Sequence, residues 1–313
     1  MDLDVRLQPA SNKLQELIEN VERVIFGREE AVTLAVVGLL AEGHILLEDA
    51  PGTGKTTLAR ALARSIDVEF RRIQFTSDLL PADVLGVSVL GGDGEFAFKR
   101  GPIFGNIVLT DELNRSTPRT QSALLEAMNE RRVSLDGVTH ELDEPFLVIA
   151  TQNPLEFEGT YPLPESQLDR FLLRIPMGYP DREVERRVLR SRVQRDPIED
   201  IASVISREEL CACIQRVREI RLEDSLMDYL LDVTTATREN GQFLSGASPR
   251  ASLGLMRAAQ SLALIEGRDY CVPDDVKRLV IPTLAHRLVA AHSTHARASE
   301  EALVELLDTI PVP

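Results

Sequence analysis

Four or five strand-like segments alternate with helical patterns over the first part of the chain. The strand-like segments cover residues 45–47, 70–75, 107–109, 146–150 and 172–175, and helical apolar spacing covers 12–25, 29–40, 57–64 and 117–130. Segments such as 45–47 and 107–109 are apolar throughout, which is typical of parallel strands covered by helices on both faces. The alternation predicts an α/β fold with a doubly wound parallel sheet.

Two further segments have the pattern of a β-hairpin. The first covers 87–98, where apolar residues including Phe96 and Phe98 alternate on either side of a glycine-rich turn. The second covers 133–142, with Asp136-Gly137 as its two-residue turn. The first could be a plain surface loop, but two phenylalanines on one strand favour a role in packing or in binding a partner.

The pattern changes after residues 178–180. From Asp181 onward we expect helices and no strands, with breaks at 196–197, 241, 267 and 273. The boundary between two domains is expected near 180–195. The first domain would cover 1–185, with both hairpins as inserts, and a smaller all-α domain would cover 190–313.

One helix start in the second part places an arginine. Ser248 and Pro249 are a typical N-cap and first helical residue. Arg250 would then lie in the first turn of a helix, which is a rigid position from which to contact an anion. The alternative is a solvated arginine at a helix end.

Composition and charge limit the classes of protein. The chain has 313 residues, of which 43% are hydrophobic and 27% charged, as in ordinary globular proteins. Its net charge of −15 argues against general binding to nucleic acid. No apolar run is long enough for membrane insertion, the acidic N-terminus lacks a signal-peptide core, and three cysteines are too few for a disulfide framework. We therefore expect a cytoplasmic protein.

Residues 49–56, Asp-Ala-Pro-Gly-Thr-Gly-Lys-Thr, lie between a predicted strand and a predicted helix. In this context Gly52 and Gly54 let backbone N–H groups converge on a phosphate, and the helix N-terminus adds a partial positive charge. Lys55 would reach the β- and γ-phosphates, and the Thr56 hydroxyl would ligate Mg²⁺. A glycine turn followed by a chance Lys-Thr is the alternative interpretation.

Two carboxylates follow the strand at 107–109. Because ligands of open α/β sheets lie at the carboxyl ends of the strands, Asp111 and Glu112 are expected beside the phosphate loop. Asp111 could hold Mg²⁺ through water, and Glu112 could orient and deprotonate an attacking water. Asn153, after the next strand, could fix that water or sense the γ-phosphate; by itself an Asn before Pro is a turn residue.

Together these motifs resemble an AAA+ ATPase, and more closely its MoxR branch. Residues 48–56 are similar to that branch's Walker A, where the acidic Asp49 at the first glycine position is familiar. Similar to further motifs of the branch are residues 110–115 (Walker B), 150–154 (sensor 1), 158–171 (the most specific stretch) and 246–251 (sensor 2). The resemblance covers residue 12 to about residue 290.

The resemblance implies ATP and Mg²⁺ as ligands and assigns roles to single residues. Arg170 would be an arginine finger that reaches the γ-phosphate of the next subunit, and Arg250 would sense the nucleotide in cis or in trans. The nucleotide would contact Gly27, against adenine, and the loop residues Asp49, Ala50, Pro51, Gly52, Thr53, Gly54, Lys55, Thr56 and Thr57. The helical domain would be the lid.

The resemblance also implies partners. Members of the branch form homo-oligomeric rings, often hexamers, and work beside proteins with a von Willebrand factor A domain. They are chaperone-like ATPases that remodel or mature partner complexes. Two alternatives stay open: a nucleotide-dependent regulatory scaffold with slow turnover, against which the intact Glu112 argues, and a chelatase-type motor subunit. A replicative helicase shares the fold, but the negative charge argues against it.

Overall fold

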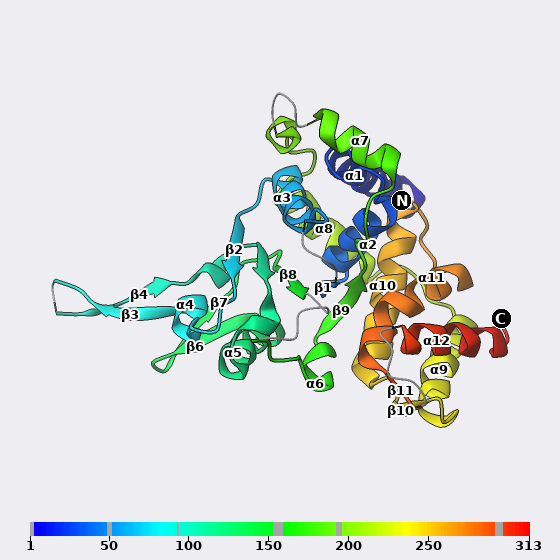
Figure 1. The fold of residues 1–313 in the computed structure, drawn as a ribbon. Coiled ribbons are helices and arrows are strands. Elements are labelled where there is room, and N and C mark those ends of the chain that lie inside the picture. Colours follow the sequence, from blue (N-terminus) through cyan, green and yellow to red (C-terminus); the bar gives the residue numbers. More distant parts are fainter. Residues whose placement is uncertain (1–2, 49–51, 93, 153–158, 192–195, 292–296) are drawn as a thin grey trace.

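A five-stranded sheet forms the centre of the molecule in the computed structural model, which describes residues 3–48, 52–92, 94–152, 159–191, 196–291 and 297–313 (Figure 1). Its strands are β1 (His44–Glu48), β2 (Phe70–Gln74), β5 (Ile107–Asp111), β8 (Leu147–Gln152) and β9 (Phe171–Ile175). Their order is β2-β5-β8-β1-β9, and all four pairings are parallel. The predicted α/β fold with a parallel sheet is confirmed.

The sheet separates two apolar cores, and its strands contribute side chains to both. On β1, Ile45 and Leu47 belong to one apolar cluster, and Leu46 belongs to the other. The first cluster includes α1 (Leu3–Glu22), α2 (Glu29–Leu40) and α3 (Lys55–Ile66), and the second includes α4 (Pro81–Leu85) and α5 (Pro118–Glu130). Burial on both faces explains why the sequence of β1 is apolar throughout.

Both predicted hairpins are present, and they pack on each other. They consist of β3 (Gly86–Leu90) with β4 (Phe96–Arg100), and of β6 (Arg132–Leu135) with β7 (Val138–Glu141). The ring of Phe98 stacks on that of His140 at 4.0 Å between centroids, and the Ser88 hydroxyl donates to Asp136 at 2.6 Å. Asp136 and Gly137 both have positive φ, as a type I′ turn requires. The β3–β4 hairpin projects far from the sheet (Figure 1).

The C-terminal part is helical, as predicted. Its helices are α7 (Arg182–Ser191), α8 (Arg207–Val217), α9 (Asp224–Glu239), α10 (Pro249–Ile265), α11 (Pro273–Leu284) and α12 (Ala298–Thr309). Ser248 caps α10, since its hydroxyl accepts the N–H of Ala251 at 3.1 Å. The expectation of no strands here is wrong in one place, where β10 (Phe243–Ser245) and β11 (Val289–Ala290) form an antiparallel ribbon. Strands this short carry too little alternation to be recognised in a sequence.

Short helices complete the chain, and one core connects its two parts. The short elements are α6 (Glu165–Leu168), η1 (Pro102–Phe104), η2 (Leu113–Arg115), η3 (Pro197–Asp200) and η4 (Ala285–Arg287). The apolar cluster that covers one face of the sheet continues through α8 to α12, so the C-terminal helices pack directly on α1, α2 and β9. Among the described residues, no helix has the length and apolar character to cross a membrane.

Candidate nucleotide-binding site

The turn between β1 and α3 has the backbone that a phosphate loop needs. Gly52 and Gly54 both have left-handed φ angles, +83° and +96°. A Cβ at Gly52 would meet no atom within 4 Å, so glycine is required there for its conformation and not for space. Residues 49–51 of the predicted loop, Asp49, Ala50 and Pro51, lie outside the described residues. Lys55 and Thr56 begin α3, so their N–H groups lie at the positive end of its dipole.

The loop and the two carboxylates face one cavity. It is lined by Gly52, Gly54, Lys55, Thr56, Thr57, Arg72, Gln74, Asp111, Glu112 and Thr151. The structure thus brings the loop, at the end of β1, to the acidic pair at the end of β5, as parallel strands require. Asn153, which the sequence also predicts here, lies outside the described residues, but Thr151 two positions earlier lines the cavity.

Asp111 and Glu112 have different environments. Asp111 is buried; its Oδ2 accepts from Arg72 Nε at 2.6 Å and its Oδ1 from the Thr151 hydroxyl at 3.3 Å. Glu112 has a left-handed φ of +57° and a partly exposed side chain. Its Oε2 accepts from Gln74 Nε2 at 2.9 Å and lies 3.3 Å from Arg115 Nε. Both carboxylates therefore have partners, but Asp111 is buried whereas the Glu112 side chain is accessible to solvent.

The oxygen donors of the cavity fit a magnesium ion. Thr56 offers a hydroxyl and Asp111 a carboxylate, which are the hard ligands that Mg²⁺ prefers alongside water and phosphate. Because Arg72 already pairs with one oxygen of Asp111, a metal here would share that carboxylate with a guanidinium.

A second cavity adjoins the loop on its other side and suits a base. Gly52, Thr53, Gly54 and Thr57 form one wall, and the other lining residues are Val24, Ile25, Phe26, Arg28, Pro180, Val184, Val188, Asp196 and Pro197. Gly27, which the family resemblance would place against adenine, makes the turn between the lining residues Phe26 and Arg28. Its φ is +64°, and a Cβ there would lie 2.6 Å from Val184.

The two predicted anion-binding arginines lie near the amino ends of the strands, whereas the phosphate loop follows the carboxyl end of β1. Arg170 directly precedes β9, and the first residue of β9 pairs with His44 at the start of β1. The loop follows the other end of β1, about 16 Å farther along the strand. Arg170 Nη1 donates to the carbonyl of Leu125 at 2.8 Å, and Arg250 Nη1 donates to Asn129 Oδ1 at 3.3 Å. Both arginines therefore contact one face of α5, away from their own loop.

Three lining residues were missed by the sequence analysis. Arg72 and Gln74 are alternate residues of β2, and Thr151 lies on β8. Gln74 lies beside Asp111 because β2 pairs with β5. The only sequence signal was the polar alternation of β2, which does not reveal the neighbouring strand.

Comparison with known proteins agrees with this geometry. Residues 44–173 match the ATPase family associated with various cellular activities (AAA), and residues 235–307 match the AAA lid domain. The chain is 42% identical to chaperone MoxR1 of Mycobacterium tuberculosis over 96% of its own length and 82% of that protein, and it also matches two proteins named MoxR. The chain belongs to the MoxR family of AAA+ ATPases.

Other relatives of this MoxR-family chain match nearly all of its length. It is 47% identical to the protein YeaC of Bacillus subtilis, over 96% of this chain and 95% of that protein. The crystal structure of a candidate ATPase from Cytophaga hutchinsonii superposes with a TM-score of 0.90 at 36% identity, covering 98% of this chain and 97% of the other. Residues 235–307 of the helical C-terminal part thus belong to an AAA lid domain, and nearly the whole chain has the fold of that structure.

Proposed function

We propose that this protein forms a homo-oligomeric ring, a hexamer, and hydrolyses ATP at sites shared between adjacent subunits. The observation that carries the proposal is the position of Arg170 and Arg250. Both contact α5 near the amino ends of the strands, whereas the phosphate loop lies at the carboxyl ends. Neither arginine therefore reaches the loop of its own subunit. An arginine supplied from a neighbour stabilises the negative charge of phosphoryl transfer and is worth about 10³–10⁵ in rate.

Within one subunit, the residues of the cavity divide the remaining tasks. Lys55 and the N–H groups of the loop would bind the phosphates, and Glu112 would orient and deprotonate the attacking water. Thr56 and Asp111 would hold Mg²⁺, which supplies charge neutralisation at the β- and γ-phosphates. Asn153 would contact the same water or the γ-phosphate, and Gly27 would turn the chain against the base.

We further propose a division into a nucleotide-binding domain over 1–185 and a lid over 190–313. Arg250, in the first turn of α10, belongs to this lid and would sense the neighbour's nucleotide in trans. Phosphate loss at one site would then act on both the finger and the lid of the neighbouring subunit, which suits a ring that converts hydrolysis into motion.

We propose that this motion acts on a protein client. The relative named chaperone MoxR1 supports a chaperone-like role, and the MoxR resemblance favours a partner with a von Willebrand factor A domain. The tip of the β3–β4 hairpin offers apolar surface for a client, since Leu90 and Phe96 are 59% and 75% exposed.

Mixing two inactive variants tests the shared site. Arg170→Ala keeps an intact phosphate site but supplies no finger, and Glu112→Gln supplies a finger but lacks the base. We expect each variant alone to lose at least about 100-fold in ATPase rate. Mixed rings should regain activity, because the finger of one variant meets the base of the other. Two variants that stay inactive when mixed, although they form mixed oligomers, would contradict the proposal.

A further inference from the structure

A buried arginine joins the lid to the segment that carries Arg170. Arg287 lies in η4, between α11 and β11, and its side chain is 4% exposed. Its Nη2 donates to the carbonyl of Phe171 at 2.7 Å and lies 3.4 Å from that of Leu172, and its Nη1 donates to Asp169 Oδ1 at 3.2 Å. The nucleotide site described above does not use this side chain.

Asp169 connects the segment that carries Arg170 with η4 and with the start of α10. It directly precedes Arg170 in the chain, and it pairs with Arg287 of the lid. Its carboxylate also accepts the hydroxyl of Ser248, with Oγ–O distances of 3.1 and 3.2 Å. Ser248 caps α10, two residues before Arg250. One carboxylate therefore fixes the backbone on which both arginines are mounted.

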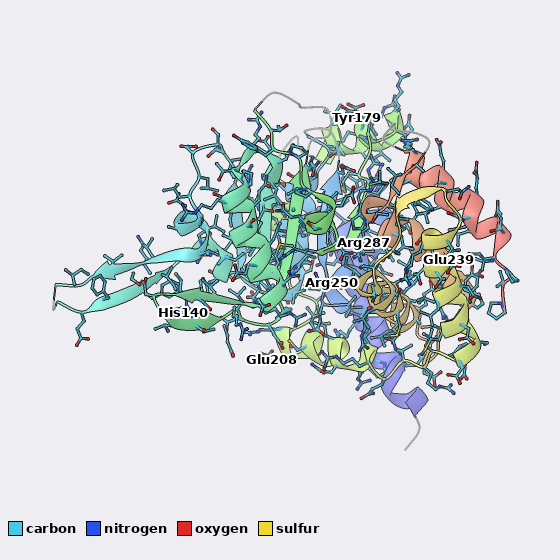
Figure 2. All side chains as sticks on the ribbon, turned by 90° about the horizontal axis from the view of Figure 1, so that it is seen from below. His140, Tyr179, Glu208, Glu239, Arg250 and Arg287 are labelled. Atoms are coloured by element: carbon cyan, nitrogen blue, oxygen red, sulfur yellow. The ribbon has the colours of Figure 1, made fainter. Side chains whose placement is uncertain are left out.

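The tips of the two arginines are held by one helix. The groups that hold Arg170 and Arg250 are the carbonyl of Leu125 and the side chain of Asn129, which are one turn apart on α5. Figure 2 shows Arg250 and Arg287 near the junction of the central strands and the C-terminal helices. The backbone positions of both arginines are thus fixed by the Asp169 cluster, and their guanidinium groups contact α5 in this subunit.

The buried charge makes this arrangement sensitive to substitution. Burial lowers the pKa of Arg287 to about 10, the nearby Asp169 carboxylate opposes this, and the guanidinium remains charged at neutral pH. A buried guanidinium whose ionic partner is removed is strongly destabilised. An apolar side chain could fill the same space without the cost of burying a charge. We therefore explain the ion pair by the specific arrangement that it fixes and not by a gain in stability.

We propose that Asp169 and Arg287 are positioning residues that fix Arg170 and Arg250 relative to each other, so that both reach the neighbouring subunit's phosphates together. The inference rests on the proposed function, because it requires that the arginines act in trans. It adds that an ion pair between lid and sheet, remote from the phosphate loop of its own subunit, sets the geometry of the shared site.

The experiment places Asp169→Asn in either partner of the mixed ring. In the finger donor, together with Glu112→Gln, we expect it to reduce the regained ATPase rate by about tenfold to 100-fold, since small misplacements of a catalytic group have effects of this size. In the acceptor, together with Arg170→Ala, it should leave the regained rate within about twofold. A purely structural role would lower the rate equally in both positions.

Glu42→Gln is the matched control. Glu42 pairs with two arginines, Arg131 at the C-cap of α5 and Arg218 of the C-terminal part. It is about as buried as Asp169, but neither of its ion pairs involves Asp169 or Arg287. Its effect should not depend on which partner carries it. If Asp169→Asn does not fold, as thermal unfolding followed by circular dichroism would reveal, Arg287→Met removes the buried charge itself and should show the same donor-specific loss.

Two results would have distinct meanings. Equal effects of Asp169→Asn in donor and acceptor, or no effect in either, would overturn the positioning role while leaving the shared site intact. Absence of regained activity without any change at Asp169 would contradict the shared site, and the positioning role with it.

Discussion

The backbone conformation of a single residue, Glu112, gives the two adjacent carboxylates different surroundings. Asp111 ends β5 and stays buried, whereas Glu112 turns into the left-handed region at φ +57°. A non-glycine residue in this region is strained by about 1–3 kcal/mol, and such strain gathers at functional sites. The turn is supported by the Thr151 hydroxyl, which accepts the N–H of Glu112 at 2.9 Å. Two adjacent carboxylates thus meet different surroundings.

His44 shows how a buried residue ties the sheet to the helix that holds the arginines. Its Nδ1 accepts the N–H of Val148, so Nε2 carries the proton and donates to the carbonyl of Met128; both distances are 3.0 Å. Met128 lies on α5 between Leu125 and Asn129. Burial, together with the charge of Arg131 and opposed by the hydrogen bond to Met128, lowers the pKa of His44 to about 4.

This pKa predicts a loss of stability in mild acid. The unfolded chain takes up a proton on His44 near pH 6.5, whereas the folded chain resists protonation until about pH 4, so stability is full above pH 6.5 and falls as the pH drops towards 4. Between pH 7 and pH 5 the free energy of unfolding should fall by about 2 kcal/mol through His44 alone. Urea unfolding of the wild type and His44→Gln at both pH values measures this. The variant should lose about 2 kcal/mol less; equal losses would contradict the assignment.

Among the elements, the β3–β4 hairpin divides into a packed base and an exposed tip. Phe98, near its base, stacks on His140 and lies edge-on to Phe104 at 5.5 Å. Phe96, two residues away on the same face, is 75% exposed. The same residue type thus packs the two hairpins together at one position and faces solvent at the next.

The difference between the two phenylalanines predicts opposite results. Phe98→Ala should lower the free energy of unfolding by at least about 1 kcal/mol, because it removes two aromatic contacts. Phe96→Ala should change it by less than about 0.5 kcal/mol, as is usual for exposed positions. Chemical denaturation of both variants decides the matter. A destabilising Phe96→Ala would mean that the tip packs against the rest of the molecule.

Local patterns explain which elements could be predicted. The strands of the sheet have apolar or alternating runs, and the start of α10 has its own signals in Ser248 and Pro249. Asp136-Gly137 likewise specifies its turn, because few other pairs tolerate two positive φ angles. The β10–β11 ribbon has no such signal: its strands are three and two residues long, and they pair across a long stretch of chain.

The site was predicted only where its residues lie in motifs. Lys55 and Asp111 belong to local sequences with a known chemical purpose. Arg72 joins them only because β2 lies next to β5, and the order of strands in a sheet is not written in any one segment. The pairing of Asp169 with Arg287 joins residues 118 positions apart, which a sequence read segment by segment does not reveal.

At the scale of the whole molecule, the residues proposed for one shared site lie at opposite ends of the strands of the sheet. The phosphate loop, Asp111 and Glu112 lie at the carboxyl ends of the strands, and Arg170 and Arg250 lie near the amino ends. A ring in which each subunit presents one edge to the next would complete every site. A monomer would bind nucleotide but lack the arginines that speed its hydrolysis.

The ATPase rate as a function of protein concentration tests this account most directly, with light scattering at each concentration in the presence and absence of ATP. The specific activity should rise steeply as the oligomer forms, and Arg170→Ala should form the oligomer without the rise. A specific activity that is the same at all concentrations, in a protein that scatters as a monomer, would contradict a site shared between subunits.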